Sequence, residues 1–270
     1  MDLVRDCDII ALQEVDCNWD RSGNRDQVEQ IANLMPDHDI AFGPTIDVAK
    51  HSGSGFQSRA RRRSGNMILS KYPIIATRNF LLPRYGAVGK LDMQKGVLEA
   101  SMDSDVGPLR VYATHLCHLC DEQRMVQAKQ ILDIHEQACR EGPVLSGEHH
   151  TDSSFASEIE LPPVPGSAIL LGDFNFLPDS DVYSAIAGAL SPRWGRVVRR
   201  GGFVDAWVVA GNEDGFGEDV AYGATAADRK RRIDYCFVSS DLAPLVTAAE
   251  VYSETNASDH FPVVMTLQHR

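Results

Sequence analysis

Short apolar runs that end in polar residues recur along the chain, and a few segments between them have helical periodicity. A short apolar run bounded by turn-forming residues is typical of a buried strand, and apolar residues three and four apart are typical of a helix. Strands are predicted at Asp8–Val15, Asn66–Ser70, Gly96–Met102, Leu109–His115, Ala168–Leu171, Ile233–Val238, Ala248–Tyr252 and Pro262–Leu267. Helices are predicted at Gln27–Leu34, Asp121–Cys139, Asp179–Leu190 and Asp205–Val209. Strands outnumber helices and mix with them irregularly, which predicts a layered α/β domain.

Three segments without clear periodicity are predicted as loops. Residues 43–64 are rich in glycine, serine and arginine, so we expect a mobile loop there. Residues 143–167 contain four prolines and the pair His149-His150, and residues 211–228 form the third loop.

The composition is that of an ordinary globular protein, with 43% hydrophobic and 24% charged residues. No apolar stretch approaches the ~20 residues needed to span a bilayer, and the first residues resemble neither a signal peptide nor a transit peptide. Six cysteines are too few for a disulfide scaffold in 270 residues, so we expect reduced thiols and a cytoplasmic location. The chain is expected to be monomeric.

Charge is unevenly distributed along this acidic chain. The net charge of −12 argues against indiscriminate binding to duplex nucleic acid. Three runs of four nevertheless hold 12 of the 26 lysines and arginines: Arg59, Arg61, Arg62 and Arg63; Arg193, Arg196, Arg199 and Arg200; and Arg229, Lys230, Arg231 and Arg232. Such runs are commonly solvated loops, but in this chain they also favour contact with an anionic substrate.

The segment Gly172-Asp173-Phe174-Asn175 follows directly on the apolar run 168–171. In an extended segment the side chains at i and i+2 point the same way, so Asp173 and Asn175 are expected to face one site. A carboxylate beside an amide suits an attack by water on phosphorus. The same four residues are also typical of an ordinary turn.

Four further strand ends carry acids or imidazoles. They contribute Glu14, His115, Asp234 and the pair Asp259-His260. Three of them have a purely structural alternative: a solvated strand end for Glu14, a helix cap for His115, and a turn for Asp259-His260. Asp234 lies so close to a strand core that it needs a partner, and His260 is the expected one. Together these residues form a metal-plus-acid/base set, in which Glu14 suits a hard cation such as Mg²⁺.

Six segments in a fixed order resemble the endonuclease/exonuclease/phosphatase superfamily, the group of deoxyribonuclease I, apurinic endonucleases, neutral sphingomyelinases, inositol-polyphosphate phosphatases and deadenylases. They are Leu12-Gln13-Glu14-Val15, Gly65-Asn66-Met67-Ile68-Leu69-Ser70, Thr114-His115-Leu116, Gly172-Asp173-Phe174-Asn175, Arg232-Ile233-Asp234-Tyr235 and Ser258-Asp259-His260. The resemblance implies a four-layer α/β sandwich of two packed mixed sheets flanked by helices, as one domain over residues 1–270.

The resemblance also implies a role for each polar residue. Glu14 ligates Mg²⁺ or Mn²⁺ with support from Asp259, while Asp173 activates or positions the attacking water. Asn175 steadies the phosphoryl oxygens, and His115 stabilises the phosphate.

His260, oriented by Asp234, contacts the scissile phosphate as acid, base or electrostatic clamp. Whether Asp173 or His260 takes the proton stays open at this point.

One departure from the family accompanies this resemblance. In the family, a first strand ending in a site asparagine precedes the helix that leads to the glutamate, and the present chain begins within that helix. We therefore expect exposed sheet edges, a looser metal pocket, and a Met1 that is an internal methionine of a longer reading frame.

The predicted function is a metal-dependent phosphoesterase that hydrolyses a phosphodiester, with nucleic acid slightly favoured as substrate. A phospholipid or inositol-phosphate phosphoesterase and a non-catalytic binding module of the same fold are the alternatives. A third class, a zinc-dependent hydrolase, would use Cys117, Cys120, His149 and His150.

Overall fold

A six-stranded mixed sheet forms the centre of the molecule. The computed structural model describes residues 1–52, 55–147, 150–152, 154, 161–215, 231–253, 255 and 258–268. The strand order is β10-β11-β7-β6-β5-β4, with β6 and β7 parallel and the other pairs antiparallel. The strands are β4 (Ile74–Leu81), β5 (Gly96–Ser104), β6 (Gly107–His115), β7 (Ala168–Asp173), β10 (Phe203–Asp205) and β11 (Asp234–Ser239).

Two smaller sheets cover one face of this central sheet. One has the order β1-β3-β2 and the other pairs β12 with β13. Their strands are β1 (Ile9–Cys17), β2 (Asp39–Ser52), β3 (Gly55–Ser70), β12 (Val246–Val251) and β13 (Val263–Leu267). Ile9 and Met265, from the two small sheets, join one apolar cluster with Val111 of the central sheet. All three sheets therefore share one core.

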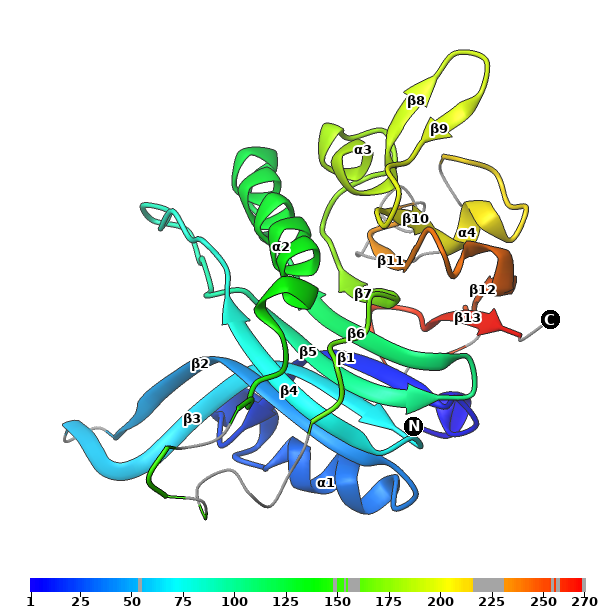
Figure 1. The fold of residues 1–270 in the computed structure, drawn as a ribbon. Helices are drawn as coiled ribbons and strands as arrows, with labels where there is room; N and C mark the ends of the chain where they lie inside the picture. The colour runs from blue at the N-terminus through cyan, green and yellow to red at the C-terminus, as the bar shows by residue number, and fades with distance from the viewer. Residues whose placement is uncertain are drawn as a thin grey trace.

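Helices complete the outer layers (Figure 1). Helices α2 (Asp121–Glu141) and α3 (Asp181–Ala187) pack on the free face of the central sheet, where Ile131 and Ile186 meet Leu170. Helix α1 (Gln27–Leu34) covers the outside of the β1-β3-β2 sheet, and α4 (Ala206–Val209) follows β10. The predicted four-layer α/β sandwich is confirmed.

Strand β1 lies at an edge of its sheet, because it pairs with β3 on one side and with no other strand that the structure describes. Strand β13 likewise pairs with β12 alone among the described strands. The expectation that a first strand of the family is missing here stays a prediction.

The loop prediction for residues 43–64 is wrong. Most of this segment belongs to the long hairpin of β2 and β3, which projects from the body of the molecule (Figure 1). Strand β3 is polar on both faces of this hairpin, where the consecutive residues Arg62 and Arg63 lie opposite Val48 and Asp47 of β2. A strand with polar residues on both faces has no alternation of apolar and polar positions, so the sequence pattern missed it.

The remaining differences are smaller. Strand β4 and the short strands β8 (Ala189–Ser191), β9 (Gly195–Val197) and β10 were not predicted. The helix predicted at residues 179–190 is limited to α3, and β8 takes up its predicted C-terminal end. All six cysteines are free thiols, as expected. Among the described helices, none is long and apolar enough to cross a membrane.

Candidate active site

Three neighbouring strands of the central sheet bring polar residues to one level. His115, the last residue of β6, lies opposite Asp173, the last residue of the parallel strand β7. Asp173 in turn lies opposite Asp234, the first residue of the antiparallel strand β11. Residues opposite one another on adjacent strands are close neighbours in a sheet. The sheet register therefore places His115, Asp173 and Asp234 in one row.

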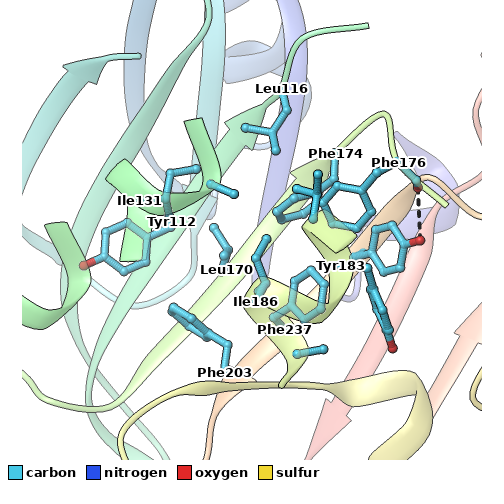
Figure 2. Close-up of a cluster of buried hydrophobic side chains, with 14 of the residues drawn as sticks. Tyr112, Leu116, Ile131, Leu170, Phe174, Phe176, Tyr183, Ile186, Phe203 and Phe237 are labelled. Carbon is cyan, nitrogen blue, oxygen red and sulfur yellow. Dashed lines mark hydrogen bonds between the residues drawn. The ribbon is translucent and has the colours of Figure 1, made fainter. Parts of the chain in front are cut away.

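The segment after β7 alternates between the site and the core. Phe174 and Phe176 are buried in an aromatic cluster with Tyr183 and Phe237 (Figure 2). The hydroxyl of Tyr235 donates to the carbonyl of Phe176 over 3.1 Å. These buried side chains fix the backbone that carries the polar residues between them.

The side chains of Asp173 and Asn175 are brought together by a turn and not, as predicted, by an extended segment. The backbone N–H of Asn175 donates to Oδ1 of Asp173 (2.9 Å), and its Nδ2 donates to Oδ2 of the same carboxylate (3.1 Å). Asn175 has a φ of +54°, a left-handed conformation that asparagine tolerates well. The other hydrogen bond of Nδ2 goes to the carbonyl of Leu116 (3.1 Å). Asn175 thus orients the carboxylate of Asp173. The turn alternative describes the backbone of this segment, and its role in a functional site stays a prediction.

The expected contact between Asp234 and His260 is present. Nδ1 of His260 lies 2.7 Å from Oδ2 of Asp234, and both side chains are largely buried. Burial alone lowers the pKa of His260, but the hydrogen bond and charge of Asp234 outweigh it and raise the pKa to about 9. His260 is therefore held as an imidazolium by its carboxylate partner.

Asp173 occupies the middle of this cluster. Burial raises its pKa above the ordinary value, and the negative charge of Asp234 adds to the effect. Its Oδ2 lies 3.4 Å from Nε2 of His115. A buried carboxylate with a raised pKa beside imidazoles is typical of groups that exchange protons with a substrate.

Lys95 is a member of the cluster that the sequence analysis missed. Its Nζ lies 2.7 Å from Nε2 of His115, and the residue is only 3% exposed. Burial lowers the pKa of Lys95 to about 8, although Glu14 and Asp173 partly oppose the shift. Burial also lowers the pKa of His115 well below its ordinary value, and the positive charge of Lys95 lowers it further. The two histidines thus have neighbours of opposite charge: His115 lies beside Lys95, and His260 lies beside Asp234.

Glu14 approaches the cluster from the other layer of the sandwich. Strand β1 has a bulge between Leu12 and Val15, where Glu14 takes a φ of +56°. Such a conformation is strained for a glutamate and is typical of functional sites. Its carboxylate is half exposed, with Oε1 3.8 Å from Nδ1 of His115. A cavity of about 20 Å³, enough for a water-sized group, is lined by Glu14, Lys95 and His115 among others.

Comparison with known proteins identifies the family. The profile of the endonuclease/exonuclease/phosphatase family matches residues 1–260. The chain belongs to this family. Its members hydrolyse phosphate esters. A search of curated proteins found no match.

Solved structures of the family share the fold at low sequence identity. An endonuclease/exonuclease/phosphatase protein from Bacteroides vulgatus is 18% identical with a TM-score of 0.61, over 100% of this chain and 88% of that one. A mannosyl-6-phosphatase from Bacteroides thetaiotaomicron is 17% identical with a TM-score of 0.57, over 99% and 88%. The human Nocturnin catalytic domain, with bound sulfate, is 16% identical with a TM-score of 0.52, over 96% and 81%. These similarities establish the fold.

The residues of the candidate site fit a divalent cation that takes few of its ligands from the protein. Within the described parts of the chain, no group of three or more His, Cys, Asp or Glu side chains is arranged to hold a metal ion. Mg²⁺ does not require so many protein ligands, because it keeps several waters and commonly binds one or two carboxylates. The half-exposed carboxylate of Glu14 fits that role. Asp259, the second expected ligand, is exposed and accepts a hydrogen bond from Ser258.

Several arginines of the basic runs are paired with acids. In the first run, Arg61 pairs with Asp47 (2.7 Å), Arg62 with Asp20, and Arg63 with Asp26 (3.8 Å); in the second, Arg196 pairs with Asp214 (2.9 Å). Arg232 is buried and pairs with Asp205 (2.6 Å), and Arg229, Lys230 and His149 lie outside the described residues. The expectation that the first run faces an anionic substrate is weakened, because three of its four arginines already pair with acids.

Proposed function

We propose that this chain is a divalent-metal-dependent phosphoesterase that hydrolyses a phosphodiester by attack of water on phosphorus. The observation that carries the proposal is the row of His115, Asp173 and Asp234 at three adjoining strand ends, completed by His260 on Asp234. The buried carboxylate of Asp173 lies between two imidazoles, one with a lowered pKa (His115) and one with a raised pKa (His260). A structural turn alone does not require such a set.

Asp173 is the group that positions the attacking water and accepts its proton. Two hydrogen bonds from Asn175 fix its carboxylate, so the oxygen that meets the water does not have to be oriented during the reaction. His260, held through Nδ1 by Asp234, presents its other nitrogen to the scissile phosphate and stabilises the negative charge that develops there. His115 provides a further hydrogen bond to the phosphate.

Glu14, with Asp259 as the second candidate ligand, would hold Mg²⁺ or Mn²⁺. When bound, the cation supplies polarisation of a phosphoryl oxygen and offsets charge on the leaving oxygen. Asp173 would still orient the water, and His260 and His115 would still orient the phosphate.

The substrate is a phosphodiester, with nucleic acid slightly favoured. The charges that still support a polyanion are the exposed arginines of the second run, Arg193, Arg199 and Arg200. A panel of a single-stranded oligonucleotide, a phospholipid and an inositol phosphate would separate nucleic acid from the alternatives of the same fold.

The test compares the parent with Asp173→Asn on bis(4-nitrophenyl) phosphate in the presence of Mg²⁺ or Mn²⁺. The variant keeps the shape of the side chain but removes the basic oxygen, so we expect turnover to fall by about 10²–10⁴-fold. Glu250→Gln, on the exposed surface of β12, serves as the matched control and should equal the parent. Equal turnover in Asp173→Asn and the parent would show that the role of Asp173 is wrong. A parent that binds the diester without hydrolysing it would support a non-catalytic binding module.

A further inference from the structure

We propose that Lys95 is a positioning residue that holds His115 in a single tautomer, with the proton on Nδ1 and directed at the cavity beside Glu14. The inference deepens the proposed function, on which it rests, by assigning a residue outside the six family-like segments to the same site. It follows from the direction of one hydrogen bond.

A lysine ammonium has three donors and no acceptor. The contact of 2.7 Å between Nζ of Lys95 and Nε2 of His115 therefore requires Nε2 to be the acceptor. A neutral imidazole carries one proton, so that proton lies on Nδ1. Nδ1 is 3.8 Å from Oε1 of Glu14, longer than a direct hydrogen bond. The cavity lined by Glu14, Lys95 and His115 lies where a phosphoryl oxygen could accept this N–H.

Without Lys95 the other tautomer has a ready acceptor. Oδ2 of Asp173 lies 3.4 Å from Nε2 of His115, and a small rotation would let Nε2–H donate to that carboxylate. His115 would then present a lone pair to the cavity, and Asp173 would be tied to a histidine instead of to water. The ammonium of Lys95 prevents this by occupying the Nε2 lone pair.

The fold holds Lys95 rigidly for this task. The residue directly precedes β5, and its carbonyl accepts from the N–H of Leu82 (2.9 Å) and from Nε2 of Gln94 (2.9 Å). The next residue, Gly96, lies opposite His115 in the β5–β6 pair. A Cβ at Gly96 would come within 2.7 Å of Thr45 Cγ2 and 2.8 Å of the Phe80 carbonyl, so only glycine fits there. The backbone at Lys95 is therefore fixed on both sides.

The same arrangement occurs elsewhere in the molecule. Nη2 of Arg110, another buried cation, lies 3.0 Å from Nδ1 of His135, and Nε2 of His135 lies 3.0 Å from the carbonyl of Gly201. A guanidinium has no acceptor, so Nδ1 accepts and Nε2 donates to the carbonyl. His135 is therefore an internal reference for a histidine whose tautomer is set by a cation.

The test measures the ring ¹⁵N shifts of His115 by two-bond ¹H–¹⁵N correlation on histidine-labelled full chain at neutral pH. His115→Gln assigns the signals by removing them, and the His135 signals report whether the core is intact. In the parent, Nδ1 should show the shift of a protonated nitrogen and Nε2 that of an unprotonated one. Lys95→Met should exchange the two shifts and lower kcat on bis(4-nitrophenyl) phosphate by about 10–100-fold, as for other residues that orient a site histidine. Lys95→Arg, which keeps a donor, should retain the parent tautomer.

Two results would overturn the proposal: a protonated Nε2 in the parent, or an unchanged His115 tautomer in Lys95→Met with the His135 signals intact. Because the ring shifts are read without turnover, they test the tautomer even if the parent hydrolyses no diester. Failure of the proposed function and failure of this inference are thus distinguishable.

Discussion

The two histidines of the site have the same side chain and opposite neighbours. His115 lies against the ammonium of Lys95, and burial together with this charge lowers its pKa well below the ordinary value. His260 lies against the carboxylate of Asp234, which overcomes burial and raises its pKa to about 9. One ring is therefore neutral and the other cationic on either side of Asp173. The difference shows that the partner of a histidine, rather than its position at a strand end, decides what it contributes.

The largest effect is expected where the cationic ring is removed. In the proposed mechanism the charge of His260 faces the scissile phosphate, so kcat/KM of His260→Gln should fall by about 10²–10⁴-fold. His115→Gln removes a neutral hydrogen-bond donor and should cost less. Steady-state kinetics of the two variants on one diester measure the difference. A greater loss in His115→Gln than in His260→Gln would reverse the assignment of the two rings.

Asp234→Asn tests the partner without removing the ring. Asparagine keeps the shape of the side chain but not its charge, so the raised pKa of His260 falls and the ring loses its positive charge at neutral pH. We expect kcat to fall by about 10–100-fold. The free energy of unfolding, measured with urea, serves as the control for structural damage. An unchanged kcat would mean that His260 needs no carboxylate.

The smallest effect concerns a histidine outside the site. Burial, followed by the charge of Arg110, lowers the pKa of His135. The unfolded state then binds more protons than the folded state below the unfolded pKa of about 6.5. The stability that neutral His135 contributes is complete above that pH and is lost as the pH falls toward the lower folded value, by at most about 1.4 kcal/mol per pH unit.

Urea unfolding at pH 7.5 and 5.5 checks this pH dependence. The parent should lose more stability between the two values than His135→Gln does. His118→Gln, at an exposed histidine, should behave as the parent. Equal losses in the parent and in His135→Gln would contradict the linkage.

Much of the candidate site was predictable because its residues lie at the ends of apolar runs. The strand ends at His115, Asp173 and Asp234 are visible in the sequence, and the shared edge of a sheet brings them together. Lys95 was missed because its importance depends on a residue 20 positions away, across the β5–β6 pair. The one available signal was a lysine before a glycine that opens an apolar strand.

The fold was predictable to a similar degree and for a similar reason. The four layers follow from apolar strands and amphipathic helices, whose periodicity reports burial. The β2–β3 hairpin was missed because cross-strand pairs such as Arg61 with Asp47 replace apolar alternation. Pairing between distant residues does not appear in a local pattern.

The central claim is that water attacks phosphorus at this site. Hydrolysis of bis(4-nitrophenyl) phosphate in H₂¹⁸O, followed by ³¹P NMR, tests it most directly. Attack on phosphorus places one ¹⁸O in the phosphate monoester, which shifts its ³¹P signal, and this incorporation should depend on Asp173. Appearance of the ¹⁸O in the nitrophenol, or the same rate of incorporation with Asp173→Asn, would contradict the account.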